Sequence, residues 1–88
     1  MACTHLTTPR PAVQPDSTGC SDCLREGTRW VHLRECLDCG HIACCDSSPR
    51  RHATAHFRSS GHPVVQSVEP GEGWVWCYAD GVLAPAPA

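Results

Sequence analysis

Cysteines and histidines between residues 36 and 62 have the spacing of metal ligands. Cys36 and Cys39 form a Cys-x2-Cys pair, and His52 and His56 are four positions apart, so both project from one face of a helix. Zinc prefers thiolate sulfur and imidazole nitrogen, and four such ligands complete a tetrahedral structural site. The stretch holds more ligands than one ion can use: Cys36, Cys39, His41, Cys44, Cys45, His52, His56 and His62. It therefore predicts the middle of a module that binds several zinc ions.

Further ligand-type residues flank this stretch on both sides: Cys3, His5, Cys20, Cys23, Cys77 and Asp80. The chain has 88 residues, which suits one small domain with a thin hydrophobic core. A domain of this size usually needs disulfides, metal or a partner for stability. Eight Cys could form four disulfides, but disulfides would leave the six His unexplained, whereas zinc accounts for most of them.

The start of the chain leads directly into ligand-type residues and has no apolar run typical of a signal peptide. No stretch is long and apolar enough to predict a membrane span. We therefore expect a cytoplasmic protein that does not bind membranes. All seven basic residues are Arg, and Pro and Ala are abundant, a composition typical of a GC-rich bacterial genome.

The formal net charge of −2 argues against a nucleic-acid-binding zinc finger. Nucleic-acid affinity depends on contacts between basic side chains and phosphates, which a mildly acidic domain supplies poorly. The sequence indicates only a local basic patch, formed by Arg50, Arg51 and Arg58. We expect no nucleic-acid partner.

Alternating hydrophobicity predicts strands over residues 29–34, 41–44, 63–69 and 74–78. Ser47, Ser48 and Pro49 are typical of a helix start, which predicts a helix from Arg50 to Arg58 that stops at Gly61. The expected fold class is α+β, a small zinc-stabilised antiparallel sheet with one main helix and cross-braced zinc sites. Residues 1–82 form the predicted domain, and residues 83–88 a flexible Pro/Ala tail.

The motifs together resemble the UBP-type zinc fingers of ubiquitin-specific proteases and of a histone deacetylase. The shared pattern is Cys-x-His, Cys-x2-Cys, Cys-x2-Cys-x4-Cys, His-x3-His-x5-His-Pro and a late Trp-Cys, and the match extends over residues 3–80. The segment from Cys44 to Ser48, with the sequence Cys-Cys-Asp-Ser-Ser, is similar to a bacterial branch of that family.

The resemblance implies three zinc ions with interleaved ligands. One group is Cys20, Cys23, Cys44 and His52; a second is Cys36, Cys39, His56 and His62; the third is Cys3, His5, Cys77 and Asp80. The family has Cys where this chain has Asp80, and a carboxylate oxygen is an acceptable zinc ligand. Alternatively, Asp80 caps a turn. Cys45 is an alternative to Cys44, although only Cys44 keeps the x4 spacing from Cys39.

The sequence does not predict an enzyme. His52 and His56 have the spacing of a zinc peptidase, but Ala53 occupies the position of the catalytic Glu. No His is followed by Glu as in nucleobase deaminases.

Members of this family that bind ubiquitin hold its C-terminal Gly-Gly in a pocket with aromatic walls and a cation. The resemblance places Trp76 and Tyr78 in such a pocket, and strand alternation adds Trp30 and Arg34, with Arg34 as the cation. The family's pocket Arg is replaced by Asp46, which would repel a carboxylate, so ubiquitin binding is not expected.

Two functions remain open at the level of the sequence. The first is a protein-interaction module that recognises a peptide or a protein C-terminal tail. The second is a purely structural or metal-responsive zinc module without a C-terminus pocket. In either case we expect a monomer.

Overall fold

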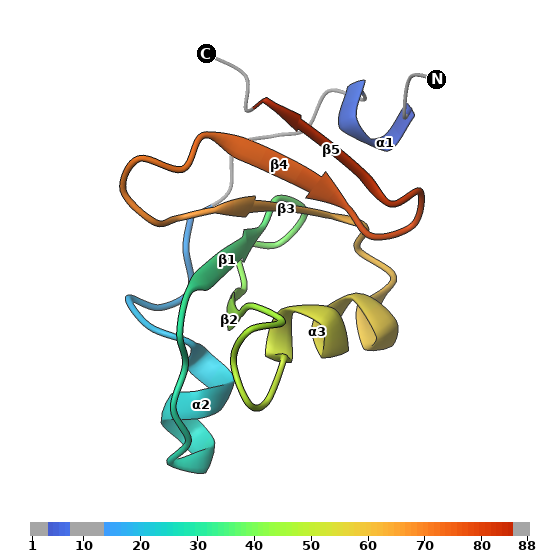
Figure 1. Cartoon of the computed structure of the whole chain (residues 1–88). Helices are drawn as coiled ribbons and strands as arrows, with labels where there is room; N and C mark the ends of the chain where they lie inside the picture. The colour runs from blue at the N-terminus through green and yellow to red at the C-terminus, as the bar shows by residue number, and fades with distance from the viewer. Residues whose placement is uncertain (1–3, 8–13, 86–88) are drawn as a thin grey trace.

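A five-stranded antiparallel sheet organises the computed structural model, which describes residues 4–7 and 14–85 (Figure 1). The strand order is β2-β1-β3-β4-β5. The strands are β1 Leu33–Cys36, β2 Ile42–Cys44, β3 Val64–Ser67, β4 Trp74–Cys77 and β5 Val82–Pro85. The helices are α1 Thr4–Thr7, α2 Ser21–Glu26 and α3 His52–Ser60. This architecture confirms the predicted α+β class.

One hydrophobic core lies against β3 and β4. Val75 and Cys77 of β4 are buried while Trp74 and Trp76 are half-buried, as alternation along a strand requires. The residues packed around Val64, Val75 and Cys77 are Leu6, Leu37, Val82 and Ala84. The core therefore joins α1, β3, β4 and β5.

A second core lies between α2 and the pair β1 and β2, and Trp30 packs against it. The predicted strand 29–34 is wrong at its start, because β1 begins only at Leu33. The Val31 N–H donates to Ser48 Oγ at 2.8 Å, so residue 31 bonds a loop and not a neighbouring strand. The Trp30 ring lies over Gly19, where an added Cβ would meet it at 2.8 Å.

The helix α3 starts two residues later than the sequence predicts. Ser48 does not cap it: this side chain is buried and accepts the Val31 N–H. Arg51 takes the N-cap position with a left-handed φ of 49° and makes no capping hydrogen bond with its side chain. Instead, the His52 N–H donates to Cys44 Sγ at 3.2 Å. The predicted stop is confirmed, since Gly61 adopts a left-handed φ of 76°.

The sheet continues past the predicted domain boundary at residue 82. The sequence predicts a flexible tail from residue 83, but residues 83–85 belong to β5. This strand pairs with β4, with Val82 opposite Cys77 and Pro85 opposite Trp74. Val82 and Ala84 pack on the core that contains Val75 and Cys77 of β4, which explains why a segment of Pro and Ala forms a strand. Residues 86–88 lie outside the described part of the chain.

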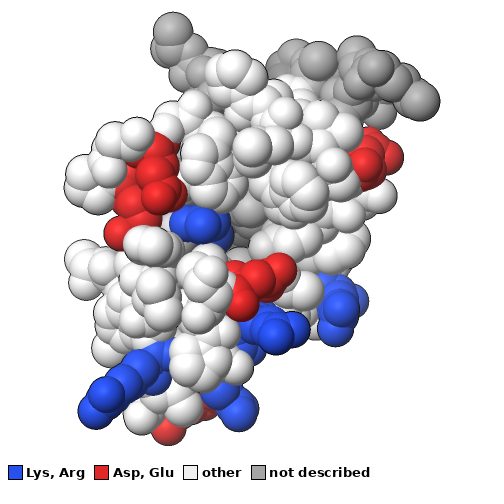
Figure 2. Space-filling view, viewed as in Figure 1, with Lys and Arg blue, Asp and Glu red and all other residues white. Residues whose placement is uncertain are grey.

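Charged side chains are unevenly distributed over the face shown in Figure 2. Basic side chains gather on the lower part, where α2 and α3 lie, and acidic patches also appear higher up, beside the sheet. In the described residues, no helix has the length and apolar character needed to cross a membrane.

Candidate metal centres

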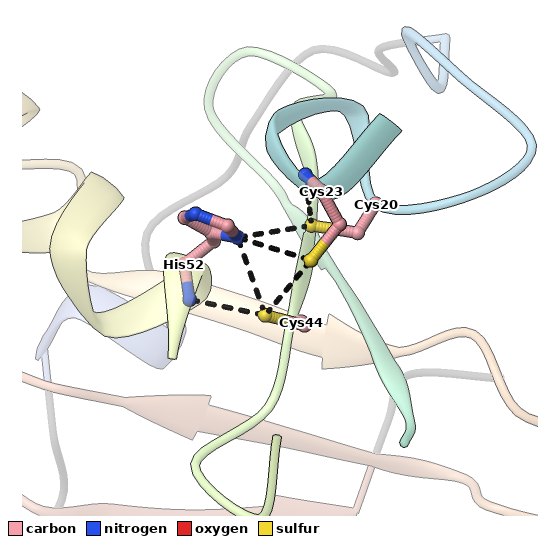
Figure 3. A group of neighbouring side chains, drawn as sticks. All are labelled: Cys20, Cys23, Cys44 and His52. Carbon is pink, nitrogen blue, oxygen red and sulfur yellow. Dashed lines mark hydrogen bonds between the residues drawn. The ribbon is translucent and has the colours of Figure 1, made fainter. Parts of the chain in front are cut away.

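The first ligand cluster joins α2, β2 and α3, and contains Cys20, Cys23, Cys44 and His52 (Figure 3). His52 Nδ1 lies 3.4 Å from Cys20 Sγ, 3.3 Å from Cys23 Sγ and 3.4 Å from Cys44 Sγ. Cys23 Sγ lies 3.9 Å from Cys44 Sγ. In a tetrahedral zinc site the metal lies about 2.3 Å from a sulfur ligand and about 2.0 Å from a nitrogen ligand. Two sulfur ligands are then about 3.8 Å apart, and a sulfur and a nitrogen ligand are about 3.5 Å apart. The donor atoms therefore fit one zinc ion.

The backbone around this cluster is arranged by its sulfur atoms. Cys20 is the N-cap of α2, where its Sγ accepts the Cys23 N–H at 3.4 Å. Cys44 ends β2 and accepts the His52 N–H that begins α3. A ligand sulfur thus accepts an N–H in the first turn of both helices, so the same contacts place the ligands and begin the helices.

Burial makes two thiols of this cluster, Cys20 and Cys44, poor acids on their own. Desolvation raises the pKa of Cys20 to about 12 and also raises the pKa of Cys44. A bound cation compensates for that desolvation, so zinc would displace the protons that the thiols otherwise keep. Outside the cluster, the Glu26 carboxylate lies 3.1 Å from His52 Nε2. This contact leaves His52 Nδ1 as the ligand atom.

Cys44 and Cys45 have different surroundings. Cys44 Sγ points into the cluster, whereas Cys45 Sγ lies 3.5 Å from Ser48 Oγ and belongs to none of the three ligand clusters. Both residues are buried, so burial alone does not distinguish them. The geometry favours Cys44 as the ligand.

The second cluster contains Cys36, Cys39, His56 and His62. Cys36 Sγ lies 3.6 Å from His62 Nδ1, and Cys39 Sγ lies 3.4 Å from His56 Nε2. The turn between the two cysteines closes with the Gly40 N–H donating to the Cys36 carbonyl at 2.7 Å. Burial raises the pKa of Cys36 to about 11, again a cost that a cation would offset.

His41 supports the second cluster without belonging to it. Its ring stacks on the His56 ring with centroids 4.6 Å apart. Its Nδ1 lies 2.7 Å from Asp16 and its Nε2 lies 2.8 Å from Asp22. Burial opposes protonation of this ring, but the hydrogen bonds to Asp22 and Asp16 prevail and raise the pKa of His41.

The helix α3 connects the two clusters. His52 in its first turn belongs to the first cluster, and His56, one turn later, belongs to the second. The ligand pairs of the two clusters also alternate along the chain, which is the cross-braced arrangement expected from the sequence. Displacing α3 would disturb both clusters at once.

The third cluster contains His5, Cys77 and Asp80, and the predicted ligand Cys3 lies outside the described residues. Cys77 Sγ lies 3.5 Å from His5 Nδ1 and 3.8 Å from Asp80 Oδ2. His5 Nδ1 and Asp80 Oδ2 are 2.9 Å apart, which is shorter than the roughly 3.3 Å expected between nitrogen and oxygen ligands of one tetrahedral ion. The side chains of His5 and Asp80 are 41% and 44% exposed. This cluster is therefore more open than the first, whose four ligands are all buried.

A pocket of about 210 Å³ lies beside the sheet, lined by Arg34, Cys45, Asp46, Trp76 and Tyr78. Three of the four residues predicted for peptide binding are therefore together. The fourth, Trp30, packs in the core around the first cluster. It is separated from the pocket because residue 30 precedes β1, so strand alternation does not relate it to Arg34.

The pocket walls are held by aromatic and cationic contacts. The rings of Trp76 and Tyr78 meet edge to face at 6.2 Å, and Tyr78 stacks on Phe57 of α3 at 5.2 Å. The Arg34 guanidinium lies 4.5 Å from the centroid of the Trp74 ring and donates to the Leu33 carbonyl at 2.9 Å. These contacts hold the cation in place.

Sequence reasoning missed the contribution of α3 to this region. Thr54 donates to Asp46 at 2.6 Å, and Phe57 supports Tyr78. Residues 54 and 57 are three positions apart and share one face of a helix, a spacing that could have indicated them.

Comparison with known proteins agrees with this geometry. Residues 20–84 match the family described as the zinc finger in ubiquitin hydrolases and other proteins. The chain is also similar to a protein from Rhodopseudomonas palustris whose structure was determined by solution NMR. That similarity has a TM-score of 0.85 and 47% identity, over 99% of this chain and 89% of the other. The chain belongs to the family of zinc fingers found in ubiquitin hydrolases and other proteins, and it is a zinc-binding module.

Proposed function

We propose that this domain is a protein-interaction module that binds the C-terminal tail of a peptide or protein in the pocket formed by Arg34, Trp76 and Tyr78. The observation that carries the proposal is the presence of two half-buried aromatic rings and one guanidinium around a single small cavity. Aromatic walls bind a peptide backbone through apolar contact, and a guanidinium can bind a carboxylate through two parallel hydrogen bonds.

The cation is suited to a carboxylate because it is already oriented. Stacking on Trp74 and the hydrogen bond to Leu33 restrict the Arg34 side chain before any ligand arrives, which lowers the entropy lost on binding. Glu72 lies 3.7 Å from Arg34 and would compete with the ligand. The cavity volume of about 210 Å³ favours small terminal residues.

Asp46 distinguishes this pocket from one suited to the ubiquitin tail. Its carboxylate lines the same cavity as Arg34 and would repel a ligand carboxylate. We therefore expect weak or no binding of ubiquitin, and the natural ligand to be another chain terminus. A reducing cytoplasm suits this role because every cluster includes at least one cysteine thiol, which must stay reduced to bind zinc.

Replacing Asp46 by Asn is expected to tighten binding of a Gly-Gly peptide with a free carboxylate. Removing a like charge at the edge of the cavity is worth roughly 1 kcal/mol, or about fivefold in Kd. The measurement is a tryptophan fluorescence titration of the zinc-loaded protein with acetylated Gly-Gly peptides. The same peptide amidated at its C-terminus is the control, and Asp46→Asn should not change its binding.

The competing possibility is a purely structural or metal-responsive module. It predicts no difference between free and amidated peptides, and that result would contradict the peptide-binding proposal. The openness of the third cluster is the observation that favours a metal response.

We further propose that the domain binds three zinc ions, one in each cluster. Metal analysis after refolding with excess zinc and desalting should give three ions per chain. Asp80→Cys should strengthen retention of the third ion against a chelator, because thiolate is the better zinc ligand. A count of two that Asp80→Cys does not raise would show that the third cluster binds no metal.

A further inference from the structure

A second and larger hollow, of about 540 Å³, runs along α3 next to the aromatic pocket. Its polar lining comes from the loop before the helix and from one face of α3: Asp46, Arg50, Arg51, Thr54, Arg58 and Ser59. Three guanidinium groups and one carboxylate give the hollow an excess of positive charge. We call it the arginine groove.

Two of these cations are not neutralised within the described residues. Arg50 Nε lies 3.2 Å from Glu26, but the guanidinium groups of Arg51 and Arg58 make no ion pair or hydrogen bond with any described side chain. Arg25 and Arg34, by contrast, are both near carboxylates. Among the other arginines of the described residues only Arg29 lacks such a contact, so the groove differs from the rest of the basic surface, part of which is seen in Figure 2, in holding two unpaired cations side by side.

The arginine groove and the aromatic pocket are adjacent, because Asp46 lines both. The Asp46 carboxylate is held by the Thr54 hydroxyl at 2.6 Å, on the helix face that forms the groove. An extended peptide advances about 3.3 Å per residue. A chain whose terminus occupies the pocket would pass Asp46 within a few residues and then enter the groove.

We propose that the arginine groove selects ligands that carry acidic residues upstream of the C-terminus held in the aromatic pocket. The inference rests on the proposed function and names the class of partner, an acidic peptide tail. Excess cationic charge attracts carboxylates on the partner and excludes basic tails. A nucleic acid fits less well, since the groove offers only three cations in a chain of formal charge −2.

The experiment compares two acetylated hexapeptides that both end in Gly-Gly with a free carboxylate. One carries Glu at its four other positions and the other carries Gln. Titration of the zinc-loaded protein, followed by tryptophan fluorescence, should give about tenfold tighter binding of the Glu peptide at low salt. The difference should shrink in 1 M salt, where the Debye length is about 3 Å.

Arg58→Gln should remove most of this preference while leaving binding of the Gln peptide unchanged. Arg29→Gln is the matched control, because Arg29 is also exposed, has no described side-chain partner and lines neither cavity. Zinc content establishes that both variants are folded.

The possible outcomes separate the two proposals. Equal binding of the Glu and Gln peptides, or equal effects of Arg58→Gln and Arg29→Gln, would overturn the inference and leave the pocket proposal intact. If neither peptide binds, both fail. Competition by a single-stranded oligonucleotide at the same concentration as the Glu peptide would also overturn the inference, because the groove would then bind polyanions in general.

Discussion

Replacing Cys44 by Ser is expected to unfold the domain. The substitution removes a ligand from the first cluster and also the sulfur that accepts the first N–H of α3. Zinc contributes on the order of 10 kcal/mol per structural site in small domains, which is comparable to the whole stability of a folded domain. Because α3 also carries His56, the second cluster should be disturbed as well. Zinc content and the dispersion of the NMR spectrum would both fall.

The matched control for this substitution is its neighbour in the sequence. Cys45→Ser changes the same atom at a buried position, but its sulfur contacts Ser48 and not the cluster. This variant should keep its full zinc content and fold. If Cys45→Ser lost an ion while Cys44→Ser did not, the ligand assignment would be reversed.

Gly40→Ala is expected to cause the second large loss of stability, although Gly40 is not a metal ligand. Gly40 ends the turn of the second cluster with a φ of 80°, and an added Cβ would lie 2.0 Å from the Gln14 carbonyl oxygen. The neighbouring Asp16 N–H donates to the Gly40 carbonyl at 2.9 Å, so the two segments cannot separate without losing that bond. Strain at a left-handed residue and steric overlap together should cost about 3 kcal/mol or more.

Gly27→Ala separates these two causes. Gly27 has a similar φ of 75°, but a Cβ there would have no atom within 4 Å. Only the cost of the left-handed conformation remains, about 1 kcal/mol. Chemical denaturation of both zinc-loaded variants measures the difference. Equal losses would show that residues 14–16 yield easily to a side chain at residue 40.

Local features of this fold can be predicted from the sequence. The stop at Gly61 and the strands within residues 63–69 and 74–78 depend on neighbouring residues, and the structure confirms them. The start of α3 depends on contacts between distant residues. Ser48 bonds Val31, and Cys44 receives the N–H that a capping serine would have taken.

The candidate sites, too, can be predicted from the sequence only where they depend on neighbouring residues. Alternation along β4 correctly separates the buried Val75 and Cys77 from Trp74 and Trp76. Alternation fails for Trp30, because residue 30 lies outside β1. The arginine groove depends on how α3 lies beside the loop that carries Asp46, and no local pattern specifies that arrangement.

The different sequence spans of the ligand clusters have a consequence for the order in which the chain folds. Cys36 and His62 are 26 positions apart, Cys20 and His52 are 32 apart, and His5 and Asp80 are 75 apart. Loop-closure entropy makes the longest of these loops about 1 kcal/mol more costly to close than the shortest. A chain emerging from the ribosome would therefore complete the first cluster at His52 and the second at His62, and His5 would find its partners last, after β4 and Asp80 have been synthesised.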